Sequence, residues 1–195
     1  GKPDVGVSFI PCVAAQIESK VQQVYEELRG NGSDYSVQIL SITKSNLGGV
    51  NSLNTALHHR YRQLDEPVFC LDAEFGIVSA KTIERVALKV GDFVICTEND
   101  YDLDLRNGSL GKIIAALHAE KMDDPCCICY FEGLEYRLNS QQIKSLNHAY
   151  SITVHKSQGS QFKRIILPIR ASNFIDQALI YTAVTRGIEQ VVLIG

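Results

Sequence analysis

Residues 149–162 read AYSITVHKSQGSQF, and residues 179–187 read LIYTAVTRG. The first stretch begins as a short apolar strand and ends in a polar turn that contains a glycine. The second reads as a helix that ends at an arginine, just before a last apolar strand, QVVLIG. A strand, a turn, a helix and a further strand in this order favour a parallel sheet covered by helices. The two stretches therefore predict an α/β fold whose chemistry lies in its turns.

The start of the chain repeats this alternation. VGVSFI (5–10) and VQILSI (37–42) are strand candidates, and between them a helix is predicted that Gly30 ends, in the turn RGNGSD. Apolar residues recur at helical spacing in two segments: Ile17, Val21, Val24 and Leu28, then Val50, Leu53, Leu57, Tyr61 and Leu64. Neither α/β piece is large enough to bury a sheet alone, so we expect residues 1–66 and 148–195 to complete one domain.

Residues 67–147 have a different character. Short strand-like runs such as VALKVGDFVIC and DPCCICYFEG alternate with turn signals, Asn107-Gly108 and Glu132-Gly133 among them. No helical period persists there. The segment is predicted to be a small all-β unit inserted into the α/β domain.

Composition limits the classes of function. The net charge of -3 and the pI of about 6.0 lack the basic signature of a protein that binds nucleic acid by charge alone. Local basic patches remain, around Arg60 and around Lys156, Lys163, Arg164 and Arg170. The chain has no signal peptide pattern and no apolar run of the roughly 18 residues that cross a bilayer. We expect a soluble cytoplasmic protein without a membrane partner.

The six cysteines are expected to be reduced residues of the core. Most lie in apolar, strand-like stretches and none forms a CxxC pair. In CCIC (126–129), adjacent cysteines are expected to point to opposite faces of a strand, which disfavours a shared tetrahedral ion. We predict no metal site.

The turn after the strand at 151–154 carries groups that suit phosphates. His155, Lys156 and Ser157 are donors for a nucleic-acid backbone, and Gln158 and Gly159 are placed to approach a nucleotide phosphate. An ordinary polar loop explains the same residues. For Arg186, the ordinary explanations are a surface salt bridge or a favourable position at the end of a helix dipole.

Taken together, TVHKSQGSQF and YTAVTRG resemble motifs V and VI of superfamily 1 helicases, and most closely those of the RecD-like branch. LGGVNSLNTAL (47–57) resembles the segment around motif IV, and VGDFVICTENDYDLDLRNGSLGKI (90–113) resembles the start of that branch's inserted SH3-like domain. The resemblance implies a RecA-like α/β domain with a small SH3-like β barrel inserted at 67–147. It also implies an ATP-dependent 5′→3′ DNA helicase of the exodeoxyribonuclease V alpha-subunit type.

The resemblance assigns roles by position. Arg186 matches the arginine finger that stabilises charge on the γ-phosphate of ATP. The residues that match nucleotide contacts are Gln158, Gly159 and Gln161, and those that match DNA contacts are Thr153, His155, Lys156 and Ser157. At Gln161 the family usually has a glutamate, which puts the contact to the nucleotide sugar in doubt, and Gly187 stands where alanine is usual.

Other candidate DNA contacts lie outside these motifs. Lys44, Ser45 and Asn54 suit phosphates, although a solvated loop and a helix cap explain them equally well. In the run from His58 to Arg62, Tyr61 is expected on the apolar stripe and the rest in solvent, which disfavours a DNA patch. Among the aromatics of the β unit, Tyr101 is the best exposed candidate for stacking on a base, and Phe131 is expected in the core.

No GxxxxGK[ST] loop and no acidic Mg²⁺ pair after an apolar strand occur in the sequence. The resemblance implies that both belong to an N-terminal RecA-like domain of the same parent chain, which binds ATP and Mg²⁺. Expected partners are that domain, single-stranded DNA and the subunits of a larger nuclease complex. Two alternatives stay open: the helicase part of a conjugative relaxase or a Pif-like helicase, and a non-catalytic DNA-binding module.

Overall fold

A computed structural model describes residues 6–28, 30, 35–169 and 177–195. The chain divides into two compact units, the first made of Gly1–Leu57 and Tyr150–Gly195 and the second of His58–Ala149. The second unit is an insertion in the first. The predicted boundaries lay at 66/67 and 147/148, so the structural division assigns the last turn of a helix to the insertion.

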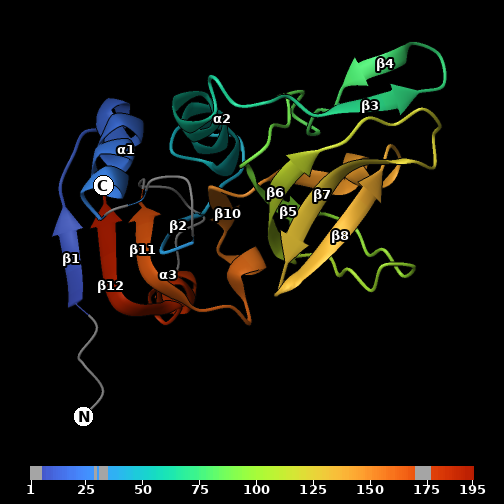
Figure 1. Cartoon of the computed structure of the whole chain (residues 1–195). Coiled ribbons are helices and arrows are strands. Elements are labelled where there is room, and N and C mark those ends of the chain that lie inside the picture. The colour runs from blue at the N-terminus through green and yellow to red at the C-terminus, as the bar shows by residue number, and fades with distance from the viewer. Residues whose placement is uncertain (1–5, 29, 31–34, 170–176) are drawn as a thin grey trace. The chain divides into compact units, whose positions relative to one another are not determined.

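The first unit is built on a parallel sheet (Figure 1). Its elements are β1 (Gly6–Ile10), the 3-10 turn η1 (Ala14–Gln16), α1 (Ile17–Glu27), β2 (Val37–Ser41), α2 (Val50–Tyr61), β10 (Ser151–Thr153), the 3-10 turn η3 (His155–Ser157), β11 (Phe162–Pro168), α3 (Gln177–Val184) and β12 (Gly187–Ile194). The strand order is β1-β12-β11-β2-β10, and every pair is parallel. This confirms the predicted α/β class.

Burial explains these elements. All five residues of β2 are buried, as is typical of a central strand that is covered on both faces. On α1, the buried side chains Ile17, Val21, Val24 and Tyr25 follow the spacing of one helical face. Gly30 follows this helix and donates its N–H to the carbonyl of Tyr25 at 2.7 Å. A Cβ at Gly30 would lie 2.6 Å from the Tyr25 ring, so the close approach requires glycine.

The predicted apolar stripe of α2 is wrong at its end. The helix stops at Tyr61, and Leu64 is 96% exposed instead of buried. Arg62 donates its N–H to the carbonyl of His58 and its guanidinium to Asp65, which closes the helix with a turn. Apolar periodicity alone did not reveal this stop.

The second unit contains two antiparallel sheets. Its elements are β3 (Phe69–Asp72), β4 (Gly76–Ser79), β5 (Phe93–Cys96), β6 (Leu110–Ala116), β7 (Pro125–Phe131), β8 (Leu134–Asn139), the 3-10 turn η2 (Gln142–Ser145) and β9 (Leu146–His148). Strands β3 and β4 form a hairpin, and the larger sheet has the order β8-β7-β6-β5-β9. The all-β character is as predicted, whereas the SH3-like barrel stays a prediction.

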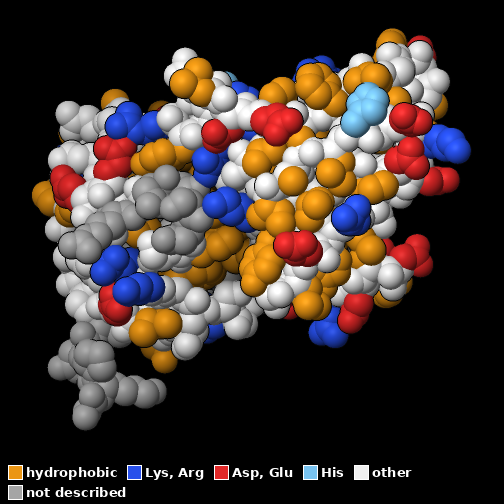
Figure 2. Space-filling view, viewed as in Figure 1, with side chains coloured by type: hydrophobic (Ala, Val, Ile, Leu, Met, Phe, Trp, Pro, Cys, Tyr) orange, Lys and Arg blue, Asp and Glu red, His pale blue; other side chains and the backbone are white. Residues whose placement is uncertain are grey.

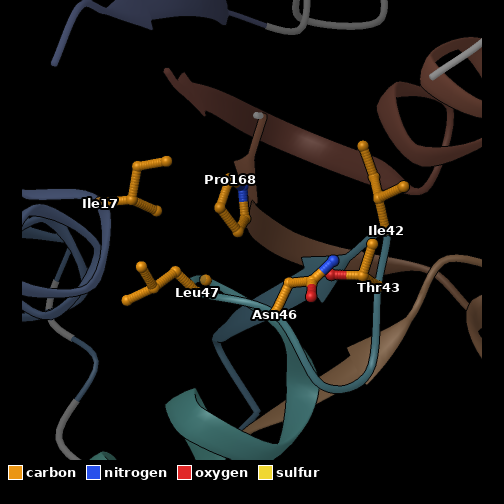
Figure 3. A pocket seen from close by; sticks show the side chains of 7 residues that line it. Ile17, Ile42, Thr43, Asn46, Leu47 and Pro168 are labelled. Atoms are coloured by element: carbon orange, nitrogen blue, oxygen red, sulfur yellow. The ribbon is translucent and has the colours of Figure 1, made fainter. Parts of the chain in front are cut away.

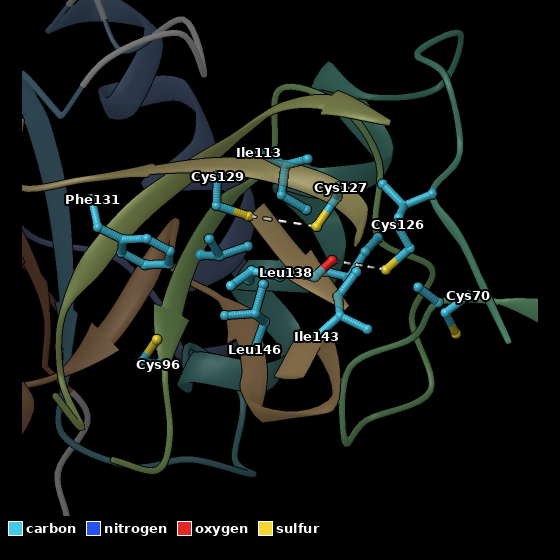
Figure 4. Packing of buried hydrophobic residues seen from close by; sticks show 14 of the residues in the cluster. Cys70, Cys96, Ile113, Cys126, Cys127, Cys129, Phe131, Leu138, Ile143 and Leu146 are labelled. Atoms are coloured by element: carbon cyan, nitrogen blue, oxygen red, sulfur yellow. Dashed lines mark hydrogen bonds between the residues drawn. The ribbon is translucent and has the colours of Figure 1, made fainter. Parts of the chain in front are cut away.

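Cysteines are part of the core of this unit (Figure 4). All six cysteines are free thiols, and all except Cys12 are buried. Burial raises the pKa of the Cys70 thiol, and a hydrogen bond with Cys127 together with burial raises that of Cys126. The Sγ atoms of Cys127 and Cys129 lie 3.8 Å apart. The prediction of reduced core cysteines is confirmed for five of the six, and Phe131 is buried beside them as expected.

No helix in the described part of the chain is both long enough and apolar enough to cross a membrane.

Candidate functional site

The candidate residues of the first unit lie in three connections of the parallel sheet. The β2–α2 loop (residues 42–49) follows the carboxyl end of β2. The β10–β11 turn (residues 154–161) starts at the carboxyl end of β10 and leads to the amino end of β11. The third connection is the tight link from α3 to β12. Because all the strands are parallel, the β10–β11 turn runs from the carboxyl ends of the strands to their amino ends.

Arg186 lies next to the far end of the β10–β11 turn. The N–H of Phe162 donates to the carbonyl of Arg186 at 2.8 Å, and Phe162 pairs with Gly187 in the sheet. The structure thus brings together the two segments that the sequence singled out. They meet at the amino ends of β11 and β12, whereas the sequence placed this chemistry at the carboxyl edge. The reason is that Arg186 lies in the turn between α3 and β12, just before the first residue of β12.

The Arg186 side chain is half-buried and forms no ion pair within the described residues. Its Nε donates to the carbonyl of Thr182 at 3.3 Å, a contact with the last turn of the preceding helix α3. Of the two ordinary explanations for Arg186, the structure therefore supports the helix-end position. A single long hydrogen bond leaves most donors of the guanidinium for another acceptor.

The first half of the β10–β11 turn is held by its own side chains. The hydroxyl of Thr153 accepts the N–H of Lys156 at 3.3 Å, and the hydroxyl of Ser157 donates to the carbonyl of Val154 at 2.6 Å. His155 is exposed and Lys156 is partly exposed, but Ser157 is completely buried. Because the Ser157 proton is used inside the turn, its geometry fits a structural role and not the predicted DNA contact.

The second half of the turn is open. Gln158, Gly159 and Gln161 are exposed. Gly159 has φ +88, in the left-handed region that favours glycine, although a Cβ there would meet no atom within 4 Å. Backbone conformation, and not lack of space, thus explains this glycine.

The β2–α2 loop presents Lys44 and Ser45 to solvent. It also forms a wall of a small pocket at the carboxyl ends of β2 and β11, where Thr43, Asn46 and Leu47 face Ile17 and Pro168 (Figure 3). From β2 the chain leads through α2 and the inserted unit to β10, on one side of β2. From β11 it leads through α3 to β12, which lies in the opposite direction in the sheet. Such a switch point is where open α/β sheets bind ligands.

Asn54 does not fit the predicted phosphate contact. It is 6% exposed and its amide is used internally. Its Nδ2 donates to the Ser151 carbonyl at 3.0 Å, and its Oδ1 accepts the Ser151 N–H at 2.7 Å. Asn54 instead fixes α2 to the first residue of β10.

The second unit contains the remaining candidate, Tyr101, and a cluster that the sequence analysis missed. Tyr101 is 88% exposed in a turn that precedes Leu105. His58 was predicted to face solvent but is only 3% exposed, because its ring bonds to a buried carboxylate. The placement of Asn54 and His58 four residues apart on one helix face was the available signal.

The buried cluster consists of His58, Asp92 and His148. His58 Nδ1 lies 2.8 Å from Asp92 Oδ1, and His148 Nε2 lies 3.1 Å from Asp92 Oδ2. Burial alone raises the pKa of the Asp92 carboxyl, but the hydrogen bonds from His148 and His58 outweigh it and hold the pKa well below its usual range. The three groups are of metal-ligand type and lie within 4.8 Å of one another. The distances are those of direct hydrogen bonds, so we interpret the cluster as a hydrogen-bonded one.

Comparison with known proteins gives these sites a context. Residues 148–194 match the family model of the UvrD-like helicase C-terminal domain. The chain is 28% identical over 170 residues to the ATP-dependent RecD2 DNA helicase of Deinococcus radiodurans, which covers 86% of this chain and 21% of that protein. It is 32% identical over 108 residues to the RecD subunit of the RecBCD enzyme of Mycolicibacterium smegmatis, over 54% of this chain and 18% of the subunit. The chain thus spans about a fifth of the length of these relatives.

A solved structure, that of Bacteroides Pif1 bound to single-stranded DNA, shares the fold. The TM-score is 0.56 at 20% identity, over 93% of this chain and 47% of that one. The sheet described above is therefore of the RecA-like type found in helicases. Residues 148–194 are thus similar to the UvrD-like helicase C-terminal domain, and most of the chain is similar in sequence to RecD-like DNA helicases.

Proposed function

We propose that the chain is the second RecA-like domain of an ATP-dependent 5′→3′ DNA helicase and supplies its arginine finger and part of its DNA track. One observation carries this proposal: the 2.8 Å hydrogen bond from Phe162 to Arg186, which joins the end of the β10–β11 turn to the candidate finger. Since the 195 residues contain no phosphate-binding loop, ATP and Mg²⁺ would be held mainly by an N-terminal RecA-like domain of the same parent chain.

On the nucleotide side, Arg186 would stabilise the charge that develops on the γ-phosphate. The exposed residues Gln158, Gly159 and Gln161 lie just before Phe162, whose N–H donates to the Arg186 carbonyl, and are proposed to face the nucleotide. An amide at Gln161 accepts a hydrogen bond from a sugar hydroxyl, although it lacks the charge of a glutamate.

On the DNA side, we assign phosphate contacts to Thr153, His155 and Lys156 at the start of the β10–β11 turn, and to Lys44 and Ser45 in the β2–α2 loop. Both connections leave the carboxyl edge of the sheet. On the face drawn in Figure 2, basic and acidic side chains are interspersed, which suits a few local phosphate contacts better than one broad basic surface. Tyr101 is proposed to stack on a base.

One turn would therefore contact DNA at its start and nucleotide at its end. A change in the nucleotide that moves Gln158–Gln161 would shift His155 and Lys156, only a few residues away. This short connection is the proposed route by which hydrolysis moves the domain along DNA.

We expect the change Lys156→Ala to weaken the binding of this chain to oligo(dT) several-fold. Loss of one phosphate contact should flatten the slope of log K against log salt concentration by about 0.7. Fluorescence anisotropy at several salt concentrations measures both quantities. The matched control is Lys163→Ala, because Lys163 is exposed and pairs with Glu189 at 3.5 Å. An unchanged slope for Lys156→Ala, or the same change for both variants, would show that Lys156 does not contact a DNA phosphate.

The direction of movement has its own test in the parent enzyme. With ATP, we expect it to displace streptavidin from the 3′ end of a biotinylated oligonucleotide, and not from the 5′ end. Displacement at the 5′ end alone would contradict the proposed polarity.

The chain described here should hydrolyse negligible ATP by itself, and robust turnover would refute the division of the motor between two domains.

A further inference from the structure

A buried polar network lies beneath the two proposed phosphate-binding connections. The hydroxyls of Ser41 and Ser151 lie 2.8 Å apart, and Ser41 Oγ also donates to the carbonyl of Gly48 at 3.0 Å. The amide of Asn54 holds the backbone of Ser151 through the two bonds described above. Ser41 and Ser151 are completely buried, so water does not replace these bonds.

The direction of the protons follows from this geometry. Ser41 has one hydroxyl proton, which goes to Gly48, and therefore Ser151 donates to Ser41. Removing the Ser41 hydroxyl leaves the Gly48 carbonyl and the Ser151 hydroxyl without this partner. Removing the Ser151 hydroxyl breaks the bridge but leaves the bond from Ser41 to Gly48.

The network links the end of the β2–α2 loop to the strand that leads into the β10–β11 turn. Gly48 is the next-to-last residue of the β2–α2 loop. Its φ is +74, and its N–H donates to the Glu18 carboxylate at 3.1 Å. Ser151 is the first residue of β10, which leads directly into the β10–β11 turn. Strand β10 is at the edge of the sheet and pairs with β2 over only three residues. Because this pairing is so short, the side-chain hydrogen bonds contribute substantially to fixing the position of β10.

We propose that Ser41, Ser151 and Asn54 are positioning residues that hold the β2–α2 loop and the β10–β11 turn in a fixed relative position for binding one DNA strand. This rests on the DNA interface proposed above. Three small polar side chains at such a buried junction cost desolvation free energy that apolar residues would avoid. A requirement for fixed spacing explains why the bonds are there.

The experiment measures oligo(dT) binding by this chain and its variants, with thermal unfolding recorded for each. We expect Ser41→Ala to weaken binding about fivefold, the effect of one hydrogen-bonded contact, and to flatten the salt slope by about 0.7. In a Lys44→Ala background the same change should weaken binding less than about twofold, because the contact that it positions is already gone. Ser19→Ala is the control, since Ser19 is exposed and its hydroxyl donates to the Gln16 carbonyl at 3.0 Å.

Two further variants separate positioning from folding. Ser41→Thr keeps the hydroxyl and should restore the affinity and the slope. If Ser41→Ala does not fold, Ser151→Ala removes the same bridge while Asn54 still holds the backbone, and the fivefold loss is expected there. A folded variant with unchanged affinity, beside Lys44→Ala and Lys156→Ala variants that bind weakly, overturns the positioning role alone. Full binding by both lysine variants overturns the DNA interface, and this inference with it.

Discussion

Replacing Arg186 with alanine in the parent enzyme is expected to lower kcat for DNA-stimulated ATP hydrolysis by about 10³- to 10⁵-fold, the range measured for arginine fingers. Binding of single-stranded DNA should change less than about twofold, because the proposed DNA contacts lie at the other end of the β10–β11 turn. The free energy of unfolding should change little, since the side chain makes one 3.3 Å bond to Thr182 and no ion pair in the described part of the chain. Steady-state hydrolysis and anisotropy measure the two effects.

Two controls sharpen this result. Arg186→Lys keeps the charge but loses the planar fork of donors, so most of the loss should remain. Arg164→Ala removes an arginine of the same unit that is already engaged, with Glu189 at 3.3 Å and the Leu28 carbonyl at 3.1 Å. This variant should unfold at lower temperature but keep its kcat. Equal losses of hydrolysis and DNA binding in Arg186→Ala would indicate a folding defect and remove Arg186 from the finger role.

The sequence predicted the elements whose apolar pattern matches their burial. The central strands β2 and β11 contain short apolar runs that are buried, Ile39–Leu40 and Ile165–Leu167, and α1 has a one-sided stripe, so apolar pattern and burial agree. The meeting of the two motif segments, seen in the bond from Phe162 to Arg186, was also predictable, because the motifs are specific. The end of the strands at which they meet was not predictable, since that depends on the order of helix and strand around Arg186.

Polar residues were harder to place than apolar ones. Asn54, Ser157 and His58 were assigned to DNA or to solvent, yet each is buried with its polar atoms bonded inside its unit. A polar side chain gains similar bonds from water, phosphate or a neighbouring backbone, and periodicity does not distinguish these partners. Only the three-dimensional neighbours do.

The largest effect on stability is expected at Asp92. We expect Asp92→Ala to lower the free energy of unfolding by about 3–5 kcal/mol, the cost of removing one partner of a buried charged network. The carboxylate accepts hydrogen bonds from His58, from His148 and from the Lys89 N–H at 2.7 Å, and all three donors lose it together. Urea unfolding followed by circular dichroism measures the loss. Asp123→Ala is the control, because Asp123 is exposed.

The position of the cluster explains why the loss should be local. His58 is the first residue of the inserted unit and His148 the next to last, so Asp92 ties together the two ends of the insertion. Hydrogen exchange should therefore increase in β5 and β9, which pair next to the cluster, before it increases in the parallel sheet. Uniform acceleration across both units would contradict this role.

The pH dependence gives the sharpest test of the charge. Because the pKa of Asp92 is lower in the folded chain than in the unfolded chain, its contribution is complete above the unfolded value of about 3.9 and declines as the pH falls below it. Asp92→Asn keeps the size of the side chain but has no charge to titrate, and it should be less stable than the wild type at neutral pH. The difference between the two unfolding free energies should shrink progressively as the pH falls below about 4. A gap that stays constant down to pH 2 would mean that shape, and not the ionised carboxylate, holds the two histidines.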